Sequence, residues 1–301
     1  MSMNLHELEL KSWDLRRYVV DIIMAGGGGH IGGDMSVLNT LLVLYKNHLR
    51  ITPETITDPN RDRFVLSKGH SVEALYAVLA DCGFLDLNDI KARFSKFGSP
   101  YIGHPNNKLP GIEMNSGSLG HGLPVCVGMA LAGKMDGRDY RVYTVMGDGE
   151  LAEGSVWEGA MAAGNYKLDN LCAVVDRNRL QISGNTEDVM KQDSQEQRWA
   201  AFGWNVISVD GNSIEAMDAA FTAAKHHAGK PTVIIANTTK GYGSSLMEDK
   251  AVGITTCLHR KNTNRSSRIF PRERRLFRMA NKIPNRLSKN SRYIRRNSLT
   301  P

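Results

Sequence analysis

The chain has 301 residues and is 41% hydrophobic, which is enough for one large α/β domain or two small ones with a sizeable core. No stretch is apolar for long enough to span a bilayer, and the charged, amphipathic start lacks the apolar core of a signal peptide. The four cysteines show no CxxC spacing, so we expect free thiols in a soluble cytoplasmic protein (Cys82, Cys126, Cys172 and Cys257).

The net charge of +7 is distributed unevenly along the chain. Residues 252–301 contain 14 of the 38 Lys and Arg but only one of the 31 acidic residues, Glu273. The remaining 24 basic and 30 acidic residues give residues 1–250 a net charge of −6. We therefore divide the chain into a mildly acidic domain, 1–250, and a basic tail, 251–301, which has little apolar periodicity and is expected to be poorly ordered.

Hydrophobic periodicity predicts helices and a strand in the first part of the domain. Residues 4–24 carry apolar side chains at helical spacing and run into the glycines at 26–29, which end the helix. A second helix is predicted over 35–49, a short strand over 63–66 and a third helix over 72–82.

The second part of the domain predicts a parallel sheet. Residues 123–135 have few charges and predict a buried helix. Strands over 140–146 and 171–176 flank a helix over 151–165, and this βαβ pattern implies parallel pairing. Two further strands and the helix between them are predicted over 204–209, 232–237 and 213–227. The fold class is therefore α/β, a parallel sheet flanked by helices, with sites at the carboxyl ends of its strands.

The turn after the first strand of this βαβ unit has the chemistry of a metal and phosphate site. Asp148 lies between Gly147 and Gly149, and Asn178 follows the next parallel strand. Mg²⁺ prefers oxygen ligands, and the free N–H groups of the following helix face an anion bound there. The Asp148 carboxylate, the Asn178 side-chain carbonyl and the Leu180 backbone carbonyl are therefore candidate magnesium ligands. A GDG alone is most often only a turn, and the Asn at the next strand end favours the metal site.

These residues belong to a longer pattern. The segment GDGELAEGSVWEGAMAAGNYKLDNLCAVVDRNRL resembles the fingerprint of thiamine diphosphate enzymes. Four further motifs make the chain resemble transketolase over about residues 5–250: GGGGHIGG (26–33), SKGHSVEALY (67–76), GHPNNKLPGIEMNSGSLGHG (103–122) and TTKGYGSSLMED (238–249). The resemblance is greatest to the separately encoded N-terminal section of split transketolases, and it implies a thiamine-diphosphate-binding domain.

The resemblance implies a role for individual residues. Asp148, Asn178 and Leu180 would hold the divalent metal. The other cofactor-binding residues would be His70, Gly117, Leu119, Gly147 and Gly149. The catalytic residues would be His30 and His104, which polarise the sugar and move protons, and Glu153, which meets the cofactor-activating half across the dimer interface.

Some of these residues, and two further ones, also have interpretations that involve no catalytic or binding role. A single histidine is more often a satisfied core or surface residue, but His30, His70 and His104 each follow a glycine, which suits a loop end at a site. His121 stands where the family often has Gln, and we expect it to lie behind the residues that touch the cofactor. Lys240 either contacts a phosphate or solvates its loop.

The resemblance also implies a reaction and a partner. Transketolases move a two-carbon ketol unit between phosphorylated sugars, and the glutamate that activates their cofactor lies on a separate pyrimidine-binding domain. At 301 residues the chain is too short to contain that domain, so we expect a dimer of heterodimers with a separate C-terminal subunit. The alternatives are another thiamine diphosphate enzyme component, of the 2-oxo acid dehydrogenase or deoxyxylulose-phosphate synthase type, and an inactive cofactor-binding subunit.

The resemblance stops at Ala251. The family continues with a Trp- and His-containing segment, whereas this chain reads VGITTCLHRKNTN. Restoring one guanine after the Ala251 codon lets these codons be read as Gly-Trp-His-His-His-Val-Pro-Thr-Pro-Glu-Glu-Tyr-Gln. We therefore hypothesise that residues 252–301 are translated out of frame. The alternative, a basic tail selected to bind nucleic acid, is not favoured, because a shifted frame explains both the abrupt change and the missing histidine.

Overall fold

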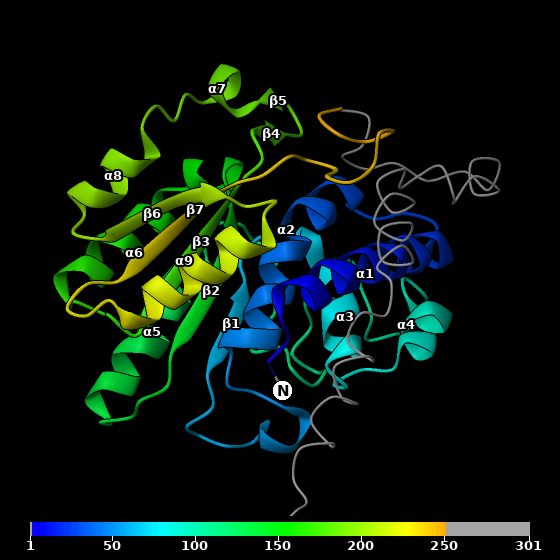
Figure 1. The fold of residues 1–301 in the computed structure, drawn as a ribbon, viewed down its shortest axis with the longest axis horizontal. Coiled ribbons are helices and arrows are strands. Elements are labelled where there is room, and N and C mark those ends of the chain that lie inside the picture. The colour runs from blue at the N-terminus through cyan, green and yellow to red at the C-terminus, as the bar shows by residue number, and fades with distance from the viewer. Residues whose placement is uncertain (1, 251–301) are drawn as a thin grey trace, which may run out of the picture.

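The computed structural model describes residues 2–250, so the predicted basic tail and Cys257 lie outside the described residues (Figure 1). Its α-helices are α1 (Leu5–Gly26), α2 (Ile31–Val43), α3 (Val72–Asp81), α4 (Leu87–Arg93), α5 (Gly122–Met135), α6 (Gly154–Asn165), α7 (Thr186–Val189), α8 (Gln195–Ala201) and α9 (Ile214–His226). A π-helix, η1 (Leu44–His48), continues α2, and three short 3₁₀ helices follow, η2 (Pro53–Thr55), η3 (Gly69–Ser71) and η4 (Gly149–Ala152).

The centre of the domain is a five-stranded parallel sheet in the order β1-β2-β3-β7-β6. Its strands are β1 (Arg63–Leu66), β2 (Val142–Gly147), β3 (Leu171–Arg177), β6 (Asn205–Asp210) and β7 (Thr232–Asn237). Every neighbouring pair is parallel, so the carboxyl ends of the strands meet at one edge. A two-stranded antiparallel hairpin, β4 (Leu180–Gln181) and β5 (Gly184–Asn185), stands beyond that edge (Figure 1).

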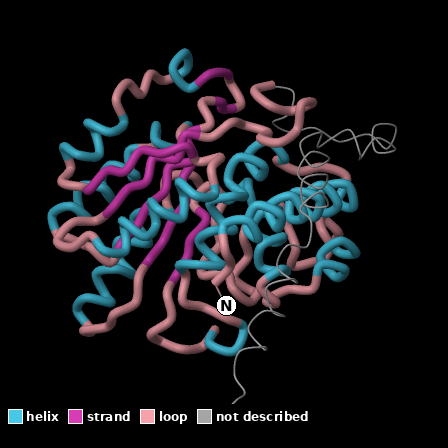
Figure 2. The backbone as a smooth tube through the Cα atoms, in the orientation of Figure 1, coloured by secondary structure: helices cyan, strands magenta, loops and turns pink. Residues whose placement is uncertain are grey.

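Helices cover both faces of the sheet (Figure 2). Along β2 the side chains alternate, so that Val142 and Met146 belong to one core and Tyr143 and Val145 to the other. The larger core is formed with α1, α2, α3 and α9, and the smaller one with α5, α6 and α8. The predicted α/β class is confirmed.

Most of the predicted elements are present. The strands over 63–66 and 232–237 and the helices near 4–24, 72–82 and 213–227 are confirmed. Helix α1 begins at a capping box in which Asn4 accepts from the Glu7 N–H, and it ends at Gly27, whose φ of 81° favours glycine. In the described region the three cysteines are free thiols, two of them buried, as predicted.

Three predictions need correction, and several short elements were missed. The helix predicted over 35–49 begins earlier, at Ile31, and its last turn is a π-helix. Helix α6 begins at Gly154 rather than at residue 151, because the 3₁₀ turn η4 comes first. Helix α5 is buried on one face only: Val125 is 38% and Met135 79% exposed. The short helices α4, α7 and α8 and the β4–β5 hairpin were not predicted.

Candidate functional site

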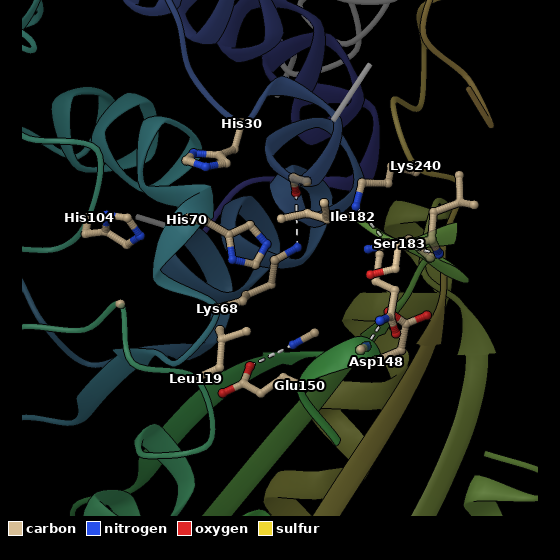
Figure 3. Close-up of a pocket in the computed structure, with 17 residues that line it drawn as sticks. His30, Lys68, His70, His104, Leu119, Asp148, Glu150, Ile182, Ser183 and Lys240 are labelled. Atoms are coloured by element: carbon tan, nitrogen blue, oxygen red, sulfur yellow. Dashed lines mark hydrogen bonds between the residues drawn. The ribbon is translucent and has the colours of Figure 1, made fainter. Parts of the chain in front are cut away.

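A cavity of about 440 Å³ opens at the carboxyl edge of the sheet (Figure 3). Loops that follow β1, β2 and β3 form much of its wall, and the start of α2, the loop between α4 and α5 and the segment after β7 form the rest. It brings together ten of the predicted site residues: His30, His70, His104, Gly117, Leu119, Gly147, Asp148, Gly149, Asn178 and Leu180. The structure thus places in one cavity side chains that lie up to about 150 positions apart in the chain.

Three histidines form one wall of the cavity (Figure 3). His30 lies immediately before α2, His70 lies in η3 after β1, and His104 comes from the loop between α4 and α5. The His30 ring centroid lies 5.6 Å from that of His70 and 6.0 Å from that of His104. Nδ1 of His30 is buried and has no hydrogen-bond partner within residues 2–250, so it is available to form a hydrogen bond with a ligand.

Burial keeps these histidines neutral. The pKa values of His30 and His104 are lowered mainly by desolvation. For His70, burial and the nearby Lys68 ammonium lower the pKa to about 2. At neutral pH each imidazole therefore has one nitrogen that can accept a proton or a hydrogen bond.

Asp148 is a buried carboxylate, only 2% exposed. Its Oδ1 accepts from the Gly149 N–H at 2.8 Å and its Oδ2 from the Arg179 N–H at 2.5 Å. Burial and the neighbouring Asp176 raise the pKa of Asp148 to about 6. A divalent cation would offset this unfavourable burial of negative charge, so the donor set fits a metal.

The other two predicted metal ligands lie beside Asp148. Nδ2 of Asn178 donates to Asp176 Oδ2 at 3.1 Å, which leaves its carbonyl oxygen to accept from the Leu180 N–H at 3.2 Å. The Leu180 carbonyl accepts from Lys240 Nζ at 2.8 Å. The Lys240 side chain therefore points into the cavity rather than into solvent around its loop. In this structure its ammonium group donates to the same Leu180 carbonyl oxygen that a metal would need as a ligand.

A second lysine, Lys68, lies in the cavity wall within a network of buried hydrogen bonds. Its Nζ pairs with Asp176 Oδ2 and donates to the Gly33 carbonyl, and both partners of the pair are almost fully buried. Burial opposes ionisation of Asp176, but Lys68 and the hydroxyls of Ser36 and Thr238 outweigh it and keep the pKa of Asp176 below its usual range. Burial and the charge of Lys68 lower the pKa of Lys240 to about 8.

The cavity contains residues that the sequence analysis did not assign. Gly33, Lys68, Glu150 and the hairpin residues Gln181, Ile182 and Ser183 also line it. Behind it, Gln192 donates from Nε2 to the Asp148 carbonyl at 2.5 Å and accepts from Gln195. The motifs SKGH and GDGE contain Lys68 and Glu150, but only the tertiary contacts indicate what these two side chains do.

Two predicted residues lie outside the cavity lining. Glu153 is exposed immediately before α6, and His121 is exposed immediately before α5. Nδ1 of His121 lies 3.1 Å from the Leu119 carbonyl. Because α6 begins at Gly154, its free N–H groups start three residues later in the chain than the predicted start at residue 151.

The sequence matches a known family over most of its length. The family model described as "Transketolase, thiamine diphosphate binding domain" matches residues 11–292. The chain belongs to the transketolase family. This finding confirms the resemblance that the five motifs indicated.

Two curated relatives in this family have a length similar to that of this chain, and both are named as transketolase subunits. The chain is 50% identical over 246 residues to the apulose-4-phosphate transketolase subunit of Phocaeicola vulgatus, covering 82% of this chain and 87% of that protein. It is 40% identical over 251 residues to "6-deoxy-6-sulfo-D-fructose transketolase subunit SqwG" of Clostridium sp. (strain MSTE9), covering 83% and 91%.

Solved transketolases share the fold. The Campylobacter jejuni transketolase superposes with a TM-score of 0.81 at 32% identity, covering 86% of this chain and 42% of that one. The Leishmania mexicana transketolase gives 0.79 at 29% identity, covering 93% and 44%. The chain thus spans less than half the length of these two transketolases, and over that length it has their fold.

Proposed function

We propose that this chain is the component of a split transketolase that binds thiamine diphosphate through a divalent metal and, with a partner subunit, transfers a two-carbon ketol unit between phosphorylated sugars. The observation that carries the proposal is the cavity itself, in which the candidate metal ligands face three neutral histidines. The family match and the relatives named as transketolase subunits support it.

Asp148, Asn178 and Leu180 are proposed to hold the metal, which we expect to be Mg²⁺. Their carboxylate, amide and backbone oxygens are hard donors, and Asp176 orients the Asn178 amide. Lys240 would leave the Leu180 carbonyl and pair with a diphosphate oxygen, which is a stronger acceptor for an ammonium group than a carbonyl is.

The same cavity suits the diphosphate. Gly33, Gly117, Gly147 and Gly149 allow the backbone to come close to phosphate oxygens. A Cβ at Gly117 would lie 3.0 Å from the His104 ring, so a side chain there would crowd the cavity. His70 is proposed to donate a hydrogen bond to the diphosphate.

His30 and His104 are the proposed proton-transfer residues. When bound, thiamine diphosphate supplies a carbon nucleophile and an electron sink for breaking a carbon–carbon bond. His30 and His104 would orient the hydroxyl groups of the sugar, and each neutral imidazole would take a hydroxyl proton and later return it.

The partner is proposed to be a pyrimidine-domain subunit, in a dimer of heterodimers. The relatives are named as subunits, which supports a second polypeptide, and the exposed position of Glu153 leaves its carboxylate accessible to one. No helix of the described residues is long and apolar enough to cross a membrane. The free thiols of Cys82, Cys126 and Cys172 support a reducing, cytoplasmic location.

The relatives also suggest which sugars to test. The name of the Phocaeicola vulgatus relative specifies apulose 4-phosphate, and that of the Clostridium relative specifies a 6-deoxy-6-sulfo ketose. Because the first of these relatives is 50% identical, apulose 4-phosphate is the first donor to test, before common ketose phosphates.

The test is a ketol-transfer assay with the chain and the pyrimidine-domain subunit from the same organism. Turnover of ketose phosphates is expected only when both polypeptides, thiamine diphosphate and Mg²⁺ are present. Preferential turnover of 2-oxo acids would favour a dehydrogenase component or a deoxyxylulose-phosphate synthase. Tight cofactor binding without turnover of any donor would identify an inactive binding subunit.

A further inference from the structure

Glu150 connects the backbone segments around the cavity. Its side chain is 2% exposed and lies in η4, two residues after Asp148. Oε1 accepts from the Gly120 N–H at 2.8 Å and from the Ser67 hydroxyl, and Oε2 accepts from the Gly147 N–H at 3.0 Å. One carboxylate therefore accepts hydrogen bonds from three segments that are far apart in sequence.

Each of these segments carries residues of the cavity wall. Ser67 begins the turn that leads to Lys68 and His70, and Gly120 ends the loop that contains Gly117 and Leu119. Gly147 precedes Asp148. Ser67 extends the connection, because its hydroxyl lies 3.2 Å from the Gly122 N–H at the start of α5.

The conformation of the loop at 117–120 makes its contact with Glu150 important. Gly117 and Gly120 both have positive φ, +143° and +83°, so the loop adopts a backbone conformation that costs little only for glycine. Besides the Glu150 contact, the described polar contacts of Gly120 include its carbonyl, which accepts from Ser155 Oγ at 2.9 Å. Among the described contacts, the Glu150 carboxylate thus joins this loop to the metal-site turn.

We propose that Glu150 is a positioning residue that fixes the loop of Gly117 and Leu119 and the Ser67–His70 turn against Asp148, so that cofactor and metal contacts are aligned before binding. Glu150 does not touch the reacting atoms and acts through these three segments. This inference rests on the proposed cofactor function, but its effect on the loop can be measured without any ligand.

Glu150→Gln is the principal test, because the amide keeps the size of the side chain but can accept through only one of its two terminal atoms. The NH₂ group must then face either the Gly147 N–H or the Gly120 N–H, and that backbone group loses its acceptor. We expect the variant to bind thiamine diphosphate with saturating Mg²⁺ at least about tenfold more weakly in calorimetric titration. Ser67→Ala, which removes one donor and leaves the backbone intact, should give a smaller loss in the same direction.

Asp62→Asn is the matched control. Asp62 is also a buried carboxylate, 1% exposed, and it accepts from the backbone N–H groups of Arg50 and Arg141. Asp62 and Arg141 directly precede β1 and β2, at the end of the sheet opposite the cavity. This control should lower the melting temperature without changing cofactor affinity more than about twofold. Equal affinity losses in Asp62→Asn and Glu150→Gln, or wild-type affinity in Glu150→Gln, would overturn the proposal.

Amide hydrogen exchange on the ligand-free protein gives the second readout. Exchange in residues 117–122 should be faster in Glu150→Gln and in Ser67→Ala than in wild type, and unchanged in Asp62→Asn. Unchanged exchange in both Glu150→Gln and Ser67→Ala would contradict the positioning role. If wild type itself failed to bind the cofactor, the proposed function would fail, and the exchange data would still decide the structural part of the inference.

Discussion

At the scale of single residues, the site combines groups that are unfavourable without a ligand. Asp148 is buried near Asp176, and Lys240 is buried near Lys68, so like charges lie close together. The Lys68–Asp176 pair is internally satisfied, whereas Asp148 and Lys240 have no oppositely charged partner in direct contact among the described residues. A metal and a diphosphate would supply the missing charges on both sides.

The first prediction concerns Asp148 in the metal-free protein. Its folded pKa of about 6 lies above the ordinary 3.8, so the folded state binds its proton more tightly. The stability that the protonated Asp148 carboxyl contributes is therefore fully present below pH 3.8. It is lost as the pH rises through 6 and the buried carboxyl ionises. In EDTA, the free energy of unfolding of Asp148→Asn minus that of wild type should increase from pH 4 to pH 8, by about 3 kcal/mol at most. Urea unfolding at both pH values measures this, and a pH-independent difference would contradict it.

The second prediction has the opposite sign and concerns His70. Its folded pKa of about 2 lies below the ordinary 6.5, so the unfolded state binds the proton more tightly. The stability that His70 contributes is present above pH 6.5 and is lost as the pH falls from 6.5 toward 2. His70→Gln should therefore flatten the loss of stability on acidification by up to about 1.4 kcal/mol per pH unit below pH 6. Urea unfolding at pH 6 and pH 5 tests this, and an unchanged slope would refute it.

At the scale of elements, the sequence predicted the parts whose signal is local. Strand β7 follows from a run of apolar residues, helix α1 follows from apolar residues at helical spacing, and the GDG turn follows from its two glycines. The end of α2 in a π-helix and the 3₁₀ turn η4 were missed, because helical spacing alone does not distinguish these variants. Helix α8 depends on Trp199, which packs against Trp157 and Trp204, and such contacts between distant residues leave no local pattern.

The candidate site likewise contains residues that local motifs predict and residues that only the tertiary structure identifies. Residues beside glycines, such as His30 and Asp148, could be assigned from motifs that resemble a family. Lys68 could not, because its partner Asp176 lies 108 positions away, and Gln192 reaches Asp148 across 44 positions. These roles depend on how the strand ends meet, which only the fold shows.

The third prediction concerns the packing of α6. A Cβ at Gly164 would lie 1.8 Å from the Phe202 carbonyl oxygen, which is backbone and cannot move aside as a side chain can. Gly164→Ala should destabilise the isolated chain by at least about 2 kcal/mol. Gly128→Ala on α5 is the control, because nothing lies within 4 Å of its added methyl group, and it should stabilise the helix by about 0.5–1 kcal/mol. Urea unfolding compares the two, and a Gly164→Ala variant as stable as wild type would show that α6 and Phe202 pack differently.

At the scale of the whole molecule, we propose that the domain supplies one side of a shared cofactor site. The chain covers 87% and 91% of the Phocaeicola and Clostridium relatives, but only 42% and 44% of the two solved transketolases. The cavity is open at the carboxyl edge of the sheet, where the β4–β5 hairpin carries the exposed Ile182. We propose that the partner subunit closes the site from this side.

The fourth prediction concerns the segment after Ala251. Independent sequencing of the gene should reveal one additional guanine after the Ala251 codon and restore the segment with Trp and three His. A protein with this restored segment should bind thiamine diphosphate more tightly than the chain with residues 252–301 as printed, because the resemblance implies that a histidine of this segment would reach the diphosphate. A confirmed gene sequence that cannot encode this segment would refute the frame hypothesis. The family model matches through residue 292, beyond Ala251 where we expected the resemblance to stop, so this match does not support the frame hypothesis, and sequencing of the gene decides.

The most direct test of the central claim is calorimetric titration of thiamine diphosphate into the chain together with its pyrimidine-domain subunit, in Mg²⁺ and in EDTA. We predict saturable binding in Mg²⁺ that is lost in EDTA and weakened at least about a hundredfold by Asp148→Asn, because this substitution removes the only charged metal ligand proposed. Binding of equal strength in EDTA, or in the Asp148→Asn variant, would contradict the claim that this cavity holds the cofactor through a metal.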